Sequence, residues 1–301
     1  MMRAECKHVW SELRETIAGL ADASRAASQM AYMKGQAQCL GVPLPAVDAA
    51  IKQYHFRGKD FLVSDAIQVL SHGLAMPYFE EKELGIRLAA KILQSHRKSL
   101  PIADAQSVLD ALHQATLDRH IMCWPVADSV ASKVLRAGLL DSAEDVQAHT
   151  QHVLDTWISA LPATAPGYDG ITYEQWCWLV RLAFVAQLSL ARQGKRTEQL
   201  LKWADTALST VHTQPSSDDM STRFVHLGIG WALREATVLH QDAVASWLLA
   251  AQAEAVFTTE GVRYATEKMP RELIMSIRQA RKSKSAVRGG RSKSQRSSGR
   301  I

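Results

Sequence analysis

Apolar residues recur along most of the chain at intervals of three and four, the spacing that places them on one face of an α-helix. Residues 8–22, for example, carry Val9, Leu13, Ile17 and Leu20 on a single stripe. We see no convincing β-branched alternation and no Asn-Gly hairpin turn, the usual signals of strands. The same helical periodicity predicts further helices over 44–55, 64–74, 78–97, 102–116, 124–139, 142–160, 173–193, 197–211, 220–238, 240–256, 258–268 and 270–281.

Most of the breaks between these segments are short and contain proline, which sits without loss at the first turn of a helix. They include Gly41-Val42-Pro43, Met76-Pro77, Leu100-Pro101 and Met269-Pro270. About a dozen short helices with tight turns predict an all-α fold, an α-solenoid of stacked antiparallel helical pairs. In such a fold equivalent helix faces line a concave groove. No strict sequence repeat is visible, so any repeats are degenerate.

The composition changes near the C-terminus. Eight of the 35 basic residues lie beyond residue 280, which leaves 27 basic against 30 acidic residues and a net charge of −3 on the rest of the chain. Residues 282–301 combine Lys and Arg with Ser and Gly and have almost no apolar side chains, a composition typical of disorder. We therefore expect one helical-repeat domain over 1–281 and a disordered basic tail over 282–301. An anion site on the domain must be a local patch.

Several classes of protein are disfavoured by the sequence. Cys6, Cys39, Cys123 and Cys177 are widely separated, which argues against a zinc ribbon, a thioredoxin motif and a disulfide framework, and favours a reducing compartment. Neither a signal peptide nor an apolar run long enough for a membrane span is evident. The histidines show no paired zinc-binding spacing, and no phosphate loop or GxSxG motif is present. We expect an intracellular protein, cytoplasmic and nucleoid-associated in a bacterium or nuclear in a eukaryote, without metal or cofactor.

The first segment with candidate chemistry runs from Met30 to Gln36 and is followed by Leu40-Gly41-Val42-Pro43. Tyr32 would project from a helix end with Lys34 close by. That pairing suits a sugar or base edge beside a phosphate. The alternative is a core tyrosine with a solvated lysine.

The second segment is Cys123-Trp124-Pro125-Val126-Ala127-Asp128. Trp124 and Asp128 are four residues apart, so they share one helical face. An aromatic surface beside a carboxylate suits cleavage of an N-glycosidic bond, because the sugar develops oxocarbenium character that a carboxylate stabilises. The alternative is a buried tryptophan with an aspartate favoured by the helix dipole.

Two further segments lie in the second half of the chain. Trp178 and Arg181 are three apart, where the guanidinium can grip a phosphate or pair with a carboxylate between neighbouring helices. The block Ile229-Gly230-Trp231-Ala232-Leu233-Arg234-Glu235 places a glycine in mid-helix, which costs about 1 kcal/mol relative to alanine. Close approach by a neighbouring helix or a ligand backbone would explain that glycine. Trp231 would then either line the site as its second aromatic side chain or pack in the core.

Together the four segments resemble the AlkD-like DNA alkylation repair glycosylases, over roughly residues 10–275. That family has a Tyr-Met-Lys stretch before a Leu-Gly-Ile/Val-x-x-Pro turn, an aromatic residue four positions before its catalytic aspartate, and a Trp followed three positions later by Arg. Its most specific signature is Lys-x-Ile-Gly-Trp-x-Leu-Arg-Glu. This chain departs from the family at Pro125, where an acidic or polar residue is usual, and at Leu227, which replaces the lysine.

The resemblance implies a HEAT-like, armadillo-type fold and a monofunctional DNA glycosylase. Its substrate would be cationic N3- or N7-alkylated purine in duplex DNA, held against a groove without a deep pocket, by a monomer that uses no metal or cofactor. It implies catalytic roles for Asp128, Trp124, Trp231 and Arg181. It implies DNA contacts for Tyr32, Lys34, Trp178 and Arg234.

Two alternatives stay open at this point. The same scaffold could bind damaged or branched DNA without cutting a bond, or it could be a protein-binding adaptor. Asp128 and Arg181 favour the enzyme, whereas the departures at Pro125 and Leu227 favour a non-catalytic protein.

Overall fold

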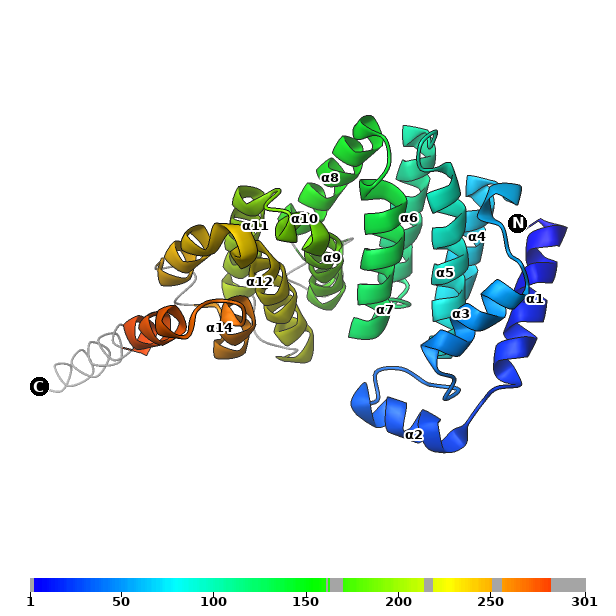
Figure 1. Ribbon diagram of the computed structural model, residues 1–301, viewed down its shortest axis with the longest axis horizontal. Coiled ribbons are helices and arrows are strands. Elements are labelled where there is room, and N and C mark those ends of the chain that lie inside the picture. The colour runs from blue at the N-terminus through cyan, green and yellow to red at the C-terminus, as the bar shows by residue number, and fades with distance from the viewer. Residues whose placement is uncertain (1–2, 161, 163–169, 214–218, 251–255, 283–301) are drawn as a thin grey trace, which may run out of the picture. The chain divides into compact units, whose positions relative to one another are not determined.

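The computed structural model describes residues 3–160, 162, 170–213, 219–250 and 256–282, and it confirms the all-α class (Figure 1). Within these ranges the only extended pairing is an isolated bridge between Gln38 and Tyr78. The chain forms two compact units, with the division between Ala186 and Gln187. That the two units form one domain over 1–281 stays a prediction. Except for Lys282, the predicted basic tail lies outside the described residues.

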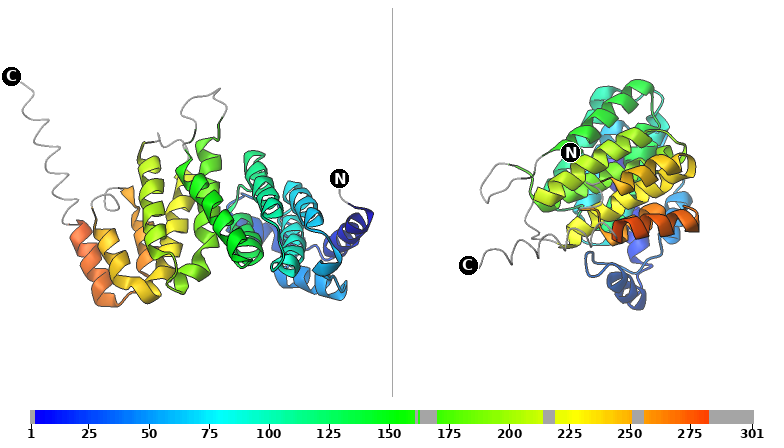
Figure 2. Two further views of the ribbon diagram at one scale, coloured as in Figure 1. Left: turned by 90° about the horizontal axis from the view of Figure 1, so that it is seen from above. Right: turned by 90° about the vertical axis from the view of Figure 1, so that its left-hand side faces the viewer.

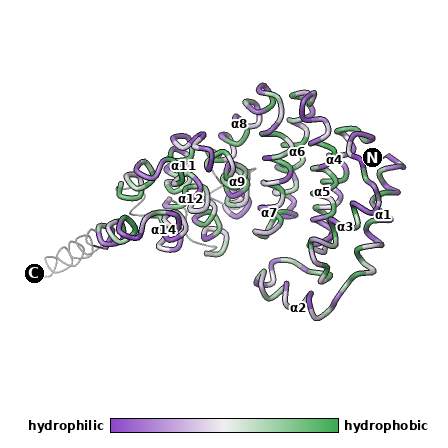
Figure 3. Tube along the Cα trace, viewed as in Figure 1, coloured by the Kyte–Doolittle hydropathy of each residue, from purple (hydrophilic) through white to green (hydrophobic). Residues whose placement is uncertain are grey.

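The first unit consists of helices packed in neighbouring pairs, and Figure 3 shows apolar and polar residues alternating along them. The elements are α1 (Ala4–Ala18), α2 (Ala23–Tyr32), α3 (Leu44–Gln53), the 3-10 turn η1 (Gly58–Asp60), α4 (Val63–Ala75), α5 (Phe79–His96), α6 (Ile102–Leu117), α7 (Trp124–Ser129), the π-helix η2 (Val130–Leu140), α8 (Glu144–Ser159) and α9 (Tyr173–Ala186).

The pair α4–α5 forms the centre of this unit because two glycines let the helix backbones approach closely. A Cβ on Gly73 would lie 2.7 Å from the Cα of Gly85, and a Cβ on Gly85 would lie 2.8 Å from the Cα of Gly73. The ring of Trp10 from α1 covers the same point. Leu70 and Leu84 are buried beside this crossing, so apolar burial holds α1, α4 and α5 together.

The second unit contains α10 (Leu188–Arg192), α11 (Thr197–Thr213), α12 (Asp219–Leu249), α14 (Thr259–Thr266) and a helix over 271–282. Helix α12 packs against α10, α11 and α14. A Cβ on Gly230 would lie 2.7 Å from the backbone oxygen of Gly261 and 2.9 Å from the Cβ of Tyr264. This confirms that the mid-helix glycine is explained by the close approach of a neighbouring helix.

Three differences from the predicted helices have physical causes. Helix α2 was not among the predicted ranges, because its apolar face consists of alanines and one methionine and only Ala26 of the helix is buried; Figures 1 and 2 show it apart from the stacked helices. The predicted helix 173–193 is broken at Gln187, after which α10 begins. After α7 the helix widens to π-type hydrogen bonding over Val130–Leu140, a feature found often near functional sites.

A buried histidine makes the second unit sensitive to acid. His226 on α12 is 2% exposed, its ring lies 5.6 Å from that of Phe257, and its Nδ1 has no hydrogen-bond partner among the residues described. Burial lowers the pKa of His226 to about 4. The unfolded chain binds a proton near pH 6.5, whereas the folded chain binds it only near pH 4. His226 therefore contributes stability that is complete above pH 6.5 and is lost as the pH falls toward 4.

We expect this loss to amount to about 3 kcal/mol in total, and replacement of His226 by leucine to remove it. Urea unfolding followed by circular dichroism at pH 7.5, 6, 5 and 4.5 would measure it in both proteins. Equal pH dependence of the unfolding free energy in the wild type and in His226→Leu would contradict the assignment.

Candidate functional site

Two aromatic rings from distant parts of the first unit meet at its surface. Tyr32, the last residue of α2, is 71% exposed, and Trp124, the first residue of α7, is half-buried. Their ring centroids are 5.5 Å apart with an angle of 74° between the planes, which is an edge-to-face contact. The structure thus brings together two residues that the sequence assigned to one site, and both rings keep surface available to a ligand.

Asp128 lies one helical turn after Trp124 and forms a two-point ion pair with Arg181 of α9. Arg181 Nε donates to Asp128 Oδ1 and Arg181 Nη2 donates to Asp128 Oδ2, both at 2.9 Å. Arg181 is 4% exposed, and the side chain of Asp128 is 17% exposed. The sequence allowed two partners for Arg181, a phosphate or a carboxylate on a neighbouring helix. This pair is the second of them. The carboxylate, not the guanidinium, is the member that reaches the surface.

Two opposing effects act on the Asp128 carboxyl. Burial raises its pKa above the ordinary value, and the charge and hydrogen bonds of Arg181 counteract part of that rise. Charge-assisted, bidentate hydrogen bonds from a guanidinium are among the strong contacts that a carboxylate makes in proteins. The arrangement can therefore present a desolvated negative charge, fixed in direction, beside an aromatic ring.

The remaining predicted residues of the first unit differ in their positions. Lys34 is exposed, two residues after Tyr32, in a left-handed backbone conformation with φ 55° that Gly35 continues with φ 74°. Its side chain is available to solvent. Trp178 is instead 1% exposed in the interior of α9, so in this structure its indole packs in the core and does not reach a surface where DNA could lie.

The second unit holds the other two predicted residues side by side. Trp231 is half-buried on α12, and the guanidinium carbon of Arg234 lies 5.7 Å from its ring centroid. Arg234 is also bound to two carboxylates, with Nη2 3.0 Å from Glu235 Oε1 and Nη1 3.1 Å from Glu267 Oε2. Its charge is thus balanced by neighbouring acids.

Glu235 joins this cluster to Lys268, whose Nζ donates to Glu235 Oε2 at 2.6 Å. Burial alone would raise the pKa of Glu235, but the hydrogen bonds from Lys268 and Arg234 hold that pKa below its ordinary value. Glu235 therefore stays ionised and keeps the Arg234 guanidinium beside the Trp231 ring. The sequence motif contained Glu235, but its role as the centre of an ion-pair cluster depends on Glu267 and Lys268, which no motif marked.

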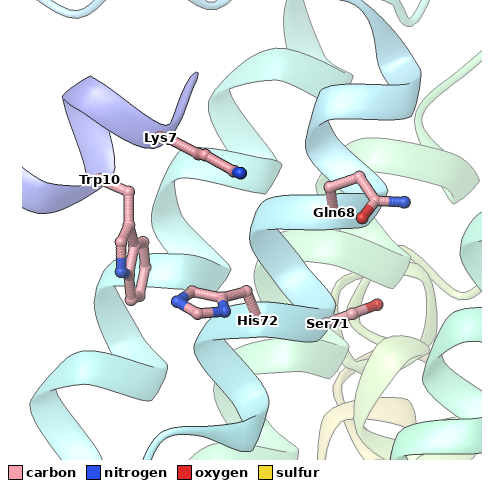
Figure 4. Close-up of a pocket in the computed structure, with 5 residues that line it drawn as sticks. All are labelled: Lys7, Trp10, Gln68, Ser71 and His72. Atoms are coloured by element: carbon pink, nitrogen blue, oxygen red, sulfur yellow. The ribbon is translucent and has the colours of Figure 1, made fainter. Parts of the chain in front are cut away.

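A surface hollow of about 490 Å³ lies elsewhere in the first unit (Figure 4). It is lined by Lys7, Trp10, Gln68, Ser71 and His72 from α1 and α4, and by none of the residues predicted for the site. In the part of the chain that the structure covers, no three His, Cys, Asp or Glu side chains are grouped as a metal site would require. No helix within the same ranges is long and apolar enough to cross a membrane.

Comparison with known proteins agrees with these observations. Residues 13–269 match the model of a family described as DNA alkylation repair enzyme. A search of curated proteins gave no significant match. Among solved structures the chain is similar to a predicted DNA alkylation repair enzyme from Enterococcus faecalis, with 18% identity, a TM-score of 0.55, and coverage of 83% of this chain and 97% of that one. At this identity the structural likeness concerns the fold. The family match spans every residue predicted for the site, and the chain belongs to the DNA alkylation repair enzyme family.

Proposed function

We propose that the protein is a monofunctional DNA glycosylase that hydrolyses the N-glycosidic bond of cationic N3- or N7-alkylated purines in duplex DNA. The observation that carries the proposal is the Asp128 carboxylate, clamped by Arg181 and one helical turn from Trp124. Membership of the DNA alkylation repair enzyme family supports DNA as the substrate, and the alkylated purine is part of the proposal.

The chemistry requires little more than these groups. An alkylated purine already carries a positive charge, so it leaves with the bonding electron pair as a neutral base and needs no acid to protonate it. The sugar is left with oxocarbenium character, and a fixed carboxylate stabilises that charge more than it stabilises the ground state. Asp128 also accepts a proton from the water whose oxygen forms the new bond to the sugar carbon.

The aromatic pair has a separate role in this proposal. The exposed ring of Tyr32 and the half-buried ring of Trp124 offer faces against which the sugar and the lesion can lie without a deep pocket. Lys34 supplies a cation for a neighbouring phosphate. In the second unit we assign Trp231 to a further aromatic contact and Arg234 to DNA binding, with the guanidinium held by Glu235 and Glu267.

The proposal is tested by incubating the protein with duplex DNA that contains one N7-methylguanine. We expect free base, an abasic site and an uncut strand, and no release from the unmodified duplex. Salt-dependent DNA binding without base release would favour the non-catalytic DNA-binding alternative. Absence of both would favour the protein-binding adaptor.

Trp124 and Trp178 provide a matched pair of substitutions. We expect Trp124→Ala to lower excision at subsaturating enzyme about 10–100-fold, because a base–aromatic contact is worth about 1–3 kcal/mol. Its loss of stability should stay well below that of Trp178→Ala, a fully buried tryptophan for which about 3–5 kcal/mol is expected. Single-turnover excision and urea unfolding of both variants would measure this. If Trp124→Ala loses as much stability as Trp178→Ala, Trp124 belongs to the core.

A further inference from the structure

Helix α2, which carries Tyr32, is attached to the first unit with very little apolar burial. Ala26 is its only buried residue, and Figures 1 and 2 show the helix standing apart from the stack. Hydrophobic stabilisation grows with buried apolar area, and an element that buries little is among the first to open locally. The buried side chain of Met33, which caps the helix directly after Tyr32, anchors its end, and specific polar contacts fix its start.

The first of these contacts join the start of α2 to the turn over 38–42. The backbone N–H of Asp22 donates to the oxygen of Leu40 at 2.9 Å. Gly41 has φ 85° and lies so close to α2 that a Cβ would be 2.0 Å from the oxygen of Asp22 and 2.7 Å from the nitrogen of Ala26. Only glycine fits this position, and α2 is seated directly on the turn.

A buried carboxylate holds the turn in place. Glu80, in the first turn of α5, is 0% exposed. Its Oε2 accepts from the N–H of Leu40 at 2.8 Å, and its Oε1 accepts from Gly41 at 2.9 Å and Val42 at 3.0 Å. Hydrogen bonds to an ionised group are about twice as strong as those between neutral groups. Glu80 therefore fixes the turn on the rigid central helix pair, and α2 on the turn.

The same turn of α5 also contacts the segment that leads into Trp124. Lys82 Nζ donates to the oxygen of Leu74 and, at 3.3 Å, to the oxygen of His120, which lies in the loop before α7. The contact to the turn below α2 and the contact to the loop before α7 thus come from residues two apart on one helix. A change at Glu80 would release one ring and leave the other in place.

We propose that Glu80 is a positioning residue that sets Tyr32 against Trp124. The carboxylate acts through the Leu40–Val42 turn and α2 and touches neither ring. Its contribution to excision rests on the proposed function, whereas its effect on the position of Tyr32 is measurable without DNA.

The test substitutes Glu80→Gln, which keeps the size of the side chain but turns an NH₂ group toward a backbone N–H. The matched control is Glu81→Gln, a neighbouring buried carboxylate that pairs with Arg14 of α1. We expect trypsin to cleave after the exposed Arg25 and Lys34 at least tenfold faster in Glu80→Gln than in Glu81→Gln. In protein labelled with 5-fluorotryptophan, the ¹⁹F resonance of Trp124, assigned with Trp124→Phe, should move as it does in Tyr32→Ala.

Excision supplies a further readout that a merely structural role would not produce. If Glu80 acts through Tyr32, the double variant Glu80→Gln/Tyr32→Ala loses no more single-turnover activity than Tyr32→Ala alone. Should Glu80→Gln fail to fold, Gly41→Ala displaces α2 from the other side of the turn and must give the same cleavage and ¹⁹F changes. Equal cleavage and an unmoved Trp124 resonance in Glu80→Gln and Glu81→Gln would overturn the proposal. A wild type that releases no base defeats the proposed function alone, because the cleavage and ¹⁹F results still decide the positioning.

Discussion

Asp128→Asn is expected to lower the release of alkylated purine by about 10²–10³-fold, the effect typical of removing one preorganised electrostatic contact to a transition state. Asparagine has almost the same shape and can still accept one hydrogen bond from Arg181, but it carries no charge to set against the oxocarbenium sugar. The loss should appear in the single-turnover rate at saturating enzyme, while affinity for undamaged duplex stays nearly unchanged.

The control for this substitution is Glu83→Gln. Glu83 is also buried and pairs with an arginine, Arg87, at 3.0 Å, so its neutralisation disturbs a second ion pair that includes neither Asp128 nor Arg181. We expect it to alter stability and to affect excision much less than Asp128→Asn does, because Glu83 is near Cys123 at the start of α7 but is not the carboxylate that Arg181 binds. Unchanged single-turnover excision by Asp128→Asn, or an equal loss in both variants, would remove Asp128 from the mechanism.

Arg181→Ala is expected to have a large effect on stability and a distinct effect on the pH profile. It leaves the Asp128 carboxylate largely buried without its partner, a situation that costs about 3–5 kcal/mol. Burial already raises the pKa of Asp128, and Arg181 opposes that rise. Without the guanidinium the pKa rises further. The acidic limb of the excision rate, where Asp128 becomes protonated, should therefore move to higher pH.

Single-turnover rates between pH 4.5 and 8, with unfolding measured in the same buffers, would separate the two effects. Arg181→Lys is the matched control, because it keeps the positive charge but loses the two-point geometry. It should lie between the wild type and Arg181→Ala in both stability and pH profile. A large fall in stability with an unmoved acidic limb would show that the pair serves the fold and that Asp128 does not titrate in the reaction.

The sequence predicted most of the helices because apolar periodicity is a local property. It also placed Trp124 and Asp128 on one face, since four residues make about one helical turn. Helix α2 was missed because its apolar face is made mainly of small alanines, and part of its anchoring comes from Glu80, about forty positions along the chain from the turn it binds. Such a contact leaves no periodic signal.

Exposure was harder to predict than secondary structure. Trp124 and Trp178 both lie in motif-bearing helices, yet one is half-buried and the other fully buried. Trp124 is the first residue of α7 whereas Trp178 lies in the interior of α9, and spacing within one helix carries no information about the neighbours that cover it. In the same way, the sequence was consistent with Arg181 as a phosphate ligand and as an ion-pair partner. The structure places Asp128 beside it, in an ion pair.

The crossing of α4 and α5 also limits which sequences can encode this unit. Gly73 and Gly85 each fill the space that the other's Cβ would need, and the obstructing atoms are backbone, which no rotamer change can move aside. Even alanine at either position would push the two helices apart. In a library randomised at both codons and selected for folding, glycine should return at both, whereas the exposed positions of α2 should accept most residues.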